Sequence, residues 1–232
     1  MSFLTPLGGA RAPSGRSLSW FPVVGLGMGA ALGAIWTGAE RAWPPLVAAA
    51  VVVLVDLGAT GALHLDGLVD AADGLLAHLE RSRRLAVMAE PGVGAFGLAA
   101  GACALLARFA ALATTTPSVL LLAGLWCASR SMMALVALTL PYAREGGGLA
   151  TAFLDGTGRR LPVAALGLAG SLGLMLAWRP LPGIVALLAA VAASAGTVAL
   201  GWRRLGGYTG DVLGAAGLVG ETVGLLVAAA RW

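Results

Sequence analysis

Residues 118–140 read SVLLLAGLWCASRSMMALVALTL and contain a single charged side chain, Arg130. A helix that crosses a bilayer needs about 20 consecutive residues that are mostly apolar. This stretch meets that requirement, so it predicts a membrane-spanning helix. Arg130 falls near the middle of the stretch, where a charged side chain needs a partner or an aqueous cavity.

Comparable apolar stretches lie on both sides of this one. Seven spans are expected in all, at residues 20–38, 43–63, 93–113, 118–140, 161–178, 182–201 and 212–230. Arg179 and Pro180 barely separate the fifth span from the sixth. The segments between spans are short and leave no room for a soluble domain. The expected fold is therefore all-α: a polytopic integral membrane protein that forms one helical membrane domain over residues 1–232.

Composition supports the same conclusion. The chain is 59% hydrophobic and only 11% charged, with a mean hydropathy of +0.89. Soluble domains are nearer 45–50% apolar and about 25% charged, so an ordinary soluble domain is excluded. All 15 basic residues are arginines, and they are scattered instead of forming a stripe, which argues against nucleic acid as a partner. Cys103 and Cys127 lie within apolar runs and are expected to be buried thiols.

The arginines also predict an orientation. With seven spans, ten arginines fall on the side of the N-terminus and three on the other side. The positive-inside rule therefore places the N-terminus in the cytoplasm. Eight of the 11 acidic residues share that side. Because crowded carboxylates repel one another unless a cation lies between them, we expect cytoplasmic active-site loops that bind a metal ion.

Residues 61–74, GALHLDGLVDAADG, contain the most specific pattern. Asp66, Asp70 and Asp73 fall within roughly 60° of one another on a helical wheel, and so on one face. Carboxylate oxygens are the ligands that Mg²⁺ prefers, and Mg²⁺ commonly bridges to substrate phosphates. The alternative is a solvated polar face of an interfacial helix. His64 lies on the opposite side of the wheel, so we expect either an acid–base or phosphate contact, or a hydrogen-bonded cap.

A second pattern is GGYTGDVLG at residues 206–214. Gly207, Thr209 and Gly210 precede or begin an expected helix, whose N-terminal N–H groups attract anions. Asp211 would repel a phosphate unless a metal ion lay between them. Glu221 follows near mid-span, where an acid is costly and is either functional or paired with a neighbouring helix.

The third pattern is PYAREGGGLATAF at residues 141–153, in which Arg144 and the following glycines are candidates to clamp a phosphate. Arg130 is a candidate for the same role. Arg108, nearer the end of its span, is expected to snorkel and is left outside the site. Gly25, Gly29 and Gly33, spaced by four, indicate close helix packing, and the same face is available for a homo-oligomer.

These patterns together resemble the cobalamin synthase family. The resemblance rests on GALHLDGLVDAADG together with FPVVGLGMG, MAEPGVGAFG, Ser129–Arg130, YAREGGGLATAF and GGYTGDVLGAAGLVGE, in the family's order. Two departures stand out. The family usually has basic residues in the segment that here reads Met88–Gly92, so we assign this turn no contact. Tyr208 stands where the family often has Gln.

The resemblance implies an enzyme that joins α-ribazole, or its 5′-phosphate, to adenosylcobinamide-GDP and releases GMP. It implies that Asp66, Asp70 and Asp211 bind Mg²⁺. Asp73 either binds the metal as well or serves as the general base that takes the hydroxyl proton. His64 is a second catalytic candidate. The candidate substrate contacts are Arg130, Arg144, Gly207, Thr209, Gly210 and Glu221. The resemblance also implies a location in the inner membrane of a bacterium, and other enzymes of the pathway are expected at its cytoplasmic surface.

Two alternatives stay open. A CDP-alcohol phosphotransferase also places spaced aspartates at a membrane surface, but it would need an Ala-Arg pair where Val69–Asp70 stands and a second aspartate pair downstream. A membrane transporter would use Arg130 and Glu221 to line a pathway. The chain shows no internal repeat, and its acids gather on one side of the membrane.

Overall fold

The computed structural model describes residues 15–144 and 161–232, and helices dominate both ranges. The elements in chain order are η2 (Gly15–Trp20, a 3-10 helix), α1 (Phe21–Ala42), α2 (Pro45–Thr60), α3 (Leu63–Leu76), α4 (Arg81–Val87), α5 (Ala95–Thr114), α6 (Val119–Thr139), α7 (Leu161–Trp178), α8 (Pro180–Leu205) and α9 (Gly210–Ala228). In the described ranges, β structure is limited to one isolated bridge between Tyr142 and Tyr208. The expected all-α fold is confirmed.

Six elements are long and apolar enough to cross a membrane by themselves: η2 with α1, then α5, α6, α7, α8 and α9. The pair α2 and α3 makes a seventh if it counts as one span. About seven membrane helices were expected, and this number is confirmed when α2 and α3 are counted together as one broken span. The fifth and sixth spans are separate helices, and the short gap expected between them is confirmed, because only Arg179 lies between α7 and α8.

The second span differs from the expectation of a straight helix over residues 43–63. α2 ends at Thr60, and α3 leaves it at an angle of 86°. The break lies at Gly61 and Ala62, whose φ angles of 58° and 55° are left-handed and end the helix. α2 by itself, with 16 residues, is about 24 Å long, which is shorter than the roughly 30 Å hydrocarbon core. The aspartates of residues 66–73 therefore lie on a helix at the end of a broken span.

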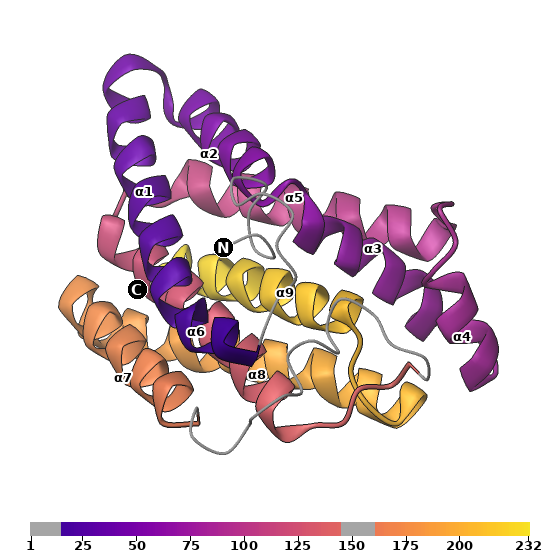
Figure 1. The fold of residues 1–232 in the computed structure, drawn as a ribbon. Coiled ribbons are helices and arrows are strands. Elements are labelled where there is room, and N and C mark those ends of the chain that lie inside the picture. The colour runs from indigo at the N-terminus through magenta and orange to yellow at the C-terminus, as the bar shows by residue number, and fades with distance from the viewer. Residues whose placement is uncertain (1–14, 145–160) are drawn as a thin grey trace.

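The two innermost helices are α6 and α9. Most of each is buried within the bundle, whereas less than half of every other spanning helix is. Figure 1 shows α9 running through the middle of the molecule, with α3 and α4 beside the end at which it begins. All of these helices are strongly apolar, so hydropathy does not distinguish the central pair from the helices that face lipid.

The glycine-spaced face of α1 packs against α6. A Cβ at Gly25 or Gly29 would overlap the backbone carbonyl of Trp126 or Leu122, and one at Gly33 would overlap Val119. The expectation of close packing by small residues is thus confirmed, and it is satisfied within the chain. The suggestion that this face serves a homo-oligomer is wrong, because α6 already covers it.

The cysteines divide between two environments. Both are free thiols; Cys127 is buried on α6, as expected, and its Sγ lies 3.4 Å from the Gly167 carbonyl oxygen. Cys103 is exposed, so the expectation that both thiols are buried is wrong for this one. The reason is that α5 lies at the edge of the bundle and buries only a minor part of its surface.

Candidate active site

The three aspartates of α3 meet different surroundings. Asp66 is exposed, Asp70 is half-buried and Asp73 is buried. The inner side of α3 carries Gly67, where a Cβ would lie 3.0 Å from the carbonyl oxygen of Asp211. Because Gly67 has no side chain, α3 lies directly on the first turn of α9. This contact brings two segments that are far apart in sequence to one place.

α9 begins at a turn that several short contacts hold in place. Gly206, with a φ of +74°, ends α8 in the left-handed conformation. Gly207 packs against the Pro141 carbonyl so closely that a Cβ would overlap it. Thr209 is buried and caps α9, since its Oγ1 accepts a hydrogen bond from the Val212 N–H at 3.2 Å. Sequence reasoning placed this helix start correctly.

The carboxylates of α3 and α9 lie near enough to act on one another. Burial and the charges of Asp66, Asp211 and Asp73 together raise the pKa of Asp70 to about 6, while Arg144 opposes the rise. α3 is not among the six helices that can each cross a membrane alone, and we refer to the place where it meets the first turn of α9 as the rim. The rim therefore concentrates negative charge, which a cation would relieve.

Arg144 pairs with one of the carboxylates at this rim. Its Nη2 donates to Asp211 Oδ2 at 2.9 Å and to the Met88 carbonyl at 3.3 Å. Thr209 Oγ1 also donates to Asp211 Oδ2, at 3.2 Å. The side chains of Arg144 and Asp211 each remain 25% exposed, so a ligand can reach both. The rest of the loop predicted to clamp phosphate, residues 145–153, lies outside the described residues.

The rim carries carboxylate oxygens that could bind a metal ion, but its described side chains do not form a complete coordination shell. Among the described residues, no group of three or more His, Cys, Asp or Glu side chains is arranged to hold a metal ion. Mg²⁺ commonly binds through one or two carboxylates, with waters and substrate phosphates completing its shell. The carboxylates of Asp66, Asp70 and Asp211 fit this kind of incomplete site, because Asp66 and Asp70 reach solvent and the neighbouring acids keep the pKa of Asp70 raised despite Arg144.

Asp73 has another set of contacts. Its Oδ2 accepts a hydrogen bond from the Gly94 N–H at 2.7 Å, and its Oδ1 accepts one from the Gly97 N–H at 2.8 Å. These N–H groups belong to the first turn of α5, which has no intrahelical acceptor for them. Asp73 thereby ties the turn after α4 to α3. A Cβ at Gly97 would overlap the Asp73 carboxylate, which explains the small residue there.

A network of buried charges lies deeper, between α2, α5, α6 and α9. Arg108 of α5 contacts two acids: its Nη2 lies 2.6 Å from Asp56 Oδ2, and its Nη1 lies 3.1 Å from Glu221 Oε2. The indole N–H of Trp126 donates to Asp56 Oδ1 at 3.2 Å, and the Arg108 guanidinium lies over the Trp126 ring. Arg108 is only 3% exposed, so the expectation that it snorkels to the surface is wrong.

Arg130 completes this network from α6. Its Nη1 donates to Glu221 Oε1 and, at 2.8 Å, to Ser129 Oγ. Its Nη2 lies 3.4 Å from Nδ1 of His64, a buried residue on the inward side of α3. Two arginines thus balance two acids among five helices. The hydrophobic core has two clusters of buried side chains, one that contains Leu218 of α9 and one that contains Leu225. Glu221, the member of the network on α9, lies between these two residues along the helix.

The structure divides the predicted site residues into two levels. The rim level contains Asp66, Asp70, Asp211, Arg144, Thr209 and Gly210. A Cβ at Gly210 would meet nothing within 4 Å, so there is open space beside the start of α9. The deep level contains His64, Arg130 and Glu221, with Asp73 anchoring the turn before α5. Glu221 lies ten residues after Asp211 on α9, a depth of about 15 Å.

Sequence reasoning missed two members of the deep network, Asp56 and Arg108. Both were visible as charged residues inside expected spans, which is itself a signal for a partner. Nothing in the sequence indicated that two further arginines would hold helix ends in place. Arg84 Nη1 donates to the carbonyls of Gly74, Leu75 and Ala77 at the end of α3, and Arg81 Nε donates to the Leu205 carbonyl at the end of α8.

Comparisons with known proteins bear on what this site does. The model of a family described as cobalamin-5-phosphate synthase matches residues 1–229. A protein of Chlorobium phaeovibrioides named adenosylcobinamide-GDP ribazoletransferase is 39% identical over 210 residues, which cover 88% of this chain and 84% of that protein. A protein of the same name from Pseudomonas paraeruginosa is 40% identical over 209 residues, covering 87% and 81%. No solved structure matches.

Proposed function

The chain belongs to the cobalamin-5-phosphate synthase family, and from this membership we propose that it joins α-ribazole or its 5′-phosphate to adenosylcobinamide-GDP. GMP leaves, and adenosylcobalamin or its 5′-phosphate forms. The family match spans nearly the whole chain, and this favours the transferase over the CDP-alcohol phosphotransferase and the transporter. The observation in the structure that supports the proposal most directly is the meeting of α3 and α9, which gathers carboxylates and Arg144 at one rim.

The proposed reaction is a substitution at phosphorus. The ribazole hydroxyl forms a bond to the phosphorus that carries the cobinamide, and the bond from that phosphorus to the bridging oxygen of GMP breaks. The electron pair of the broken bond leaves with GMP, and the hydroxyl proton passes to a base or to water. Such transfers depend mainly on positioning and on neutralisation of charge, with little covalent participation by the protein.

We propose that Asp66, Asp70 and Asp211 hold Mg²⁺, which when bound offsets the negative charge of the substrate pyrophosphate. Arg144 already contacts Asp211 and stays partly exposed, so it can donate to a phosphate oxygen as well. The open space beside Gly210 and the N–H groups that begin α9 lie next to this pair. Thr209 supports the site as the cap of α9, and Gly207 permits the close approach to Pro141.

The remaining candidates support the rim in this proposal. Both oxygens of Asp73 accept hydrogen bonds from α5, which favours an anchoring role over metal binding or proton transfer. Arg130 and Glu221 are buried against one another, and His64 joins them to α3. A phosphate contact at this level would require the network to open. We therefore assign these residues to the positioning of α3, which carries Asp66 and Asp70.

We also propose that the rim faces the cytoplasm of a bacterium, from the inner membrane. Arg81, Arg84, Arg144, Arg203 and Arg204 all lie at or beside this end of the bundle, as the positive-inside rule expects. α1 starts at the same end, because Gly25 near its beginning packs on Trp126 and Gly33 near its middle packs on Val119. A homo-oligomer and contacts with other pathway enzymes stay predictions.

The test is turnover by the purified protein in detergent or liposomes. We expect GMP release from adenosylcobinamide-GDP only when both α-ribazole and Mg²⁺ are present, and no release after chelation of the metal. CDP-diacylglycerol in place of adenosylcobinamide-GDP should give no product. Absence of GMP release with every component present contradicts the proposed reaction.

Asp70→Asn addresses the site itself. The substitution removes a metal-binding oxygen while keeping the size of the side chain, so turnover should be lost while membrane insertion is normal. Glu90→Gln is the matched control, because Glu90 is an exposed acid of the same connection and pairs with Arg83, which is not a proposed ligand. Normal turnover in Asp70→Asn contradicts the metal role of this residue.

A further inference from the structure

A shallow groove runs between α6 and α8 on the outside of the bundle. Its volume is about 390 Å³. Apolar side chains form most of its wall, with one arginine at its end: Met132, Val136, Leu140, Ala195, Val198, Ala199, Trp202 and Arg203. The lining contains no acidic residue. The groove is thus apolar along its length and basic at one end.

We expect the basic end to lie at the level of the lipid headgroups. α8 has 26 residues and is about 39 Å long, so it extends beyond the roughly 30 Å hydrocarbon core. Arg203 belongs to its last turn, and the neighbouring Trp202 is 44% exposed, as is common for aromatic residues at a membrane interface. From Met132 to Leu140 the groove extends about 12 Å, close to the depth of one leaflet.

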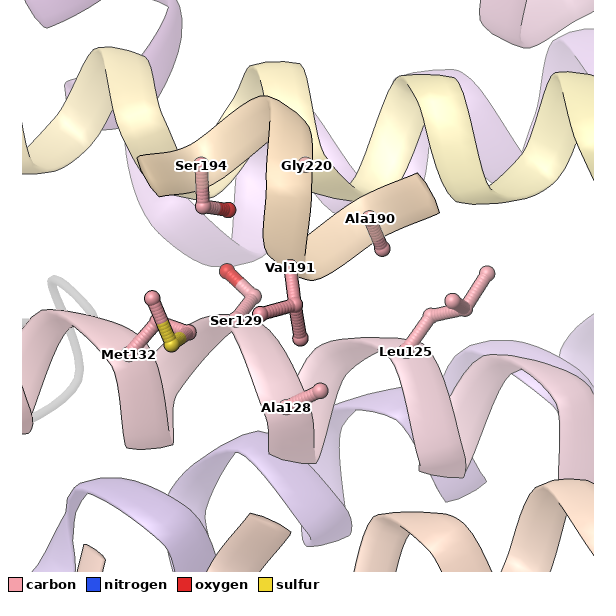
Figure 2. A pocket seen from close by; sticks show the side chains of 8 residues that line it. All are labelled: Leu125, Ala128, Ser129, Met132, Ala190, Val191, Ser194 and Gly220. Carbon is pink, nitrogen blue, oxygen red and sulfur yellow. The ribbon is translucent and has the colours of Figure 1, made fainter. Parts of the chain in front are cut away.

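The inner end of the groove is closed. Figure 2 shows the next part of the same seam, where Ser129 and Met132 of α6 face Val191 and Ser194 of α8. This crevice is too narrow to admit water. Ser129 accepts the hydrogen bond from Arg130, and Ser194 donates to the Ala216 carbonyl at 2.9 Å, so polar groups there are already satisfied. An apolar chain that enters from the basic end would stop at Met132.

Arg203 has no ion pair or hydrogen bond among the described residues, although it lies at the mouth of an apolar groove. We propose that this groove binds one anionic phospholipid of the surrounding leaflet, with an acyl chain along α6 and α8 and the headgroup phosphate on Arg203. The length, the apolar wall and the single basic mouth together match this ligand.

The site would adjoin the rim of the candidate active site. Leu140 lines the groove, and the residues that follow it form the bridge in which the Ala143 N–H donates to the Tyr208 carbonyl at 2.8 Å. The Tyr208 N–H donates to the Pro141 carbonyl at 3.1 Å. Arg144 and Asp211 lie just beyond these two segments. A bound lipid would therefore brace the pair of segments that carry them.

The experiment uses the full chain in nanodiscs of phosphatidylcholine that contain a minor share of phosphatidylglycerol. After gentle extraction, native mass spectrometry counts the lipids that stay bound. We expect the wild type to retain phosphatidylglycerol in preference to phosphatidylcholine. Arg203→Gln should lower this retention about fivefold, the factor for one basic residue near an anionic lipid surface. Ala199→Trp should lower it as well by filling the groove.

The controls are Arg204→Gln and Ala102→Trp. Arg204 belongs to the same turn but does not line the groove, and Ala102 is an exposed alanine of α5, a helix that contributes no residue to the groove. Both should retain lipid as the wild type does, with unchanged melting temperatures in all four variants. Equal retention of the two lipids by the wild type overturns the proposal, as does an equal effect of Arg203→Gln and Arg204→Gln. A dimer that Ala199→Trp disperses would assign the groove to a second copy instead. None of these readouts depends on turnover.

Discussion

Arg108 and Asp56 form a buried ion pair, with Nη2 of the arginine 2.6 Å from Oδ2 of the aspartate. The pair joins α5 to the broken span, and Glu221 and Arg130 continue the network to α9 and α6. Because no water solvates a charge inside the lipid, each charged side chain of the network needs the opposite charges of the others for its stabilisation. This arrangement holds the helix break beneath α3, and α3 carries two of the proposed metal ligands.

Loss of one partner should destabilise the fold strongly. Arg108→Met leaves Asp56 and part of Glu221 without a counter-charge, and breaking a buried pair typically costs about 3–5 kcal/mol. We expect a clearly lower midpoint of thermal or denaturant unfolding in micelles. Arg83→Gln is the control, since the Arg83–Glu90 pair is exposed and such pairs contribute roughly 0–1 kcal/mol. Equal effects of the two substitutions would show that the network contributes little.

Asp73 should act as an anchor and not as a metal ligand. Asp73→Ala removes the acceptor for the Gly94 and Gly97 N–H groups, and loss of such a cap typically costs about 0.5–2 kcal/mol. We expect lower stability and reduced turnover, with the Mg²⁺ concentration for half-maximal turnover unchanged. A large increase in that concentration would instead assign Asp73 to the metal.

The raised pKa of Asp70 predicts opposite effects on stability and function. Its pKa of about 6 lies above the unfolded value of 3.8, so without metal its contribution to stability falls as pH rises between these values. Above about pH 6 the Asp70 carboxylate is charged and repelled by its neighbours. Asp70→Asn should therefore raise the melting temperature at pH 8 in chelator.

Addition of Mg²⁺ supplies the other half of this test. Mg²⁺ should raise the melting temperature of the wild type, with a stronger effect at pH 8 than at pH 5, because the ligand must be deprotonated. It should have little effect on Asp70→Asn. Glu80→Gln, which changes an exposed acid beyond α3, should respond as the wild type does. A metal effect that is equal at both pH values would argue against Asp70 as a ligand.

Contact between α3 and α9 at Gly67 should be required for turnover. Gly67→Val places a branched side chain against the Asp211 backbone and separates the two helices, so the carboxylates can no longer share a ligand. We expect a large loss of turnover with the protein still inserted in the membrane. Gly38→Val is the control, because a Cβ at Gly38 meets nothing within 4 Å. Comparable losses in both variants would point to a general effect of glycine replacement.

The sequence predicted the spans well and their contacts poorly. The run at residues 118–140 became α6, and the stop at Arg179 was visible as a single break. The Asp211 helix start was also predicted, because a Thr cap and glycines are local signals. The fate of Arg108 was not predicted, since nothing near it in the chain indicates that Asp56 and Glu221 lie opposite. Asp73 has the same spacing as its neighbours, yet its partners come from the next helix.

The sequence by itself determined that this chain is a helical membrane protein with acids gathered at one end. Entry of a segment into lipid depends on its own length and hydropathy, and helix ends depend on a few adjacent residues. Only the tertiary structure decided which of those acids and arginines meet. That outcome depends on which helix faces touch, and α1, α6, α8 and α9 are so uniformly apolar that their periodicity does not specify a partner. Glycines such as Gly67 and Gly25 set those contacts through close packing, which becomes visible only once both helices are in place.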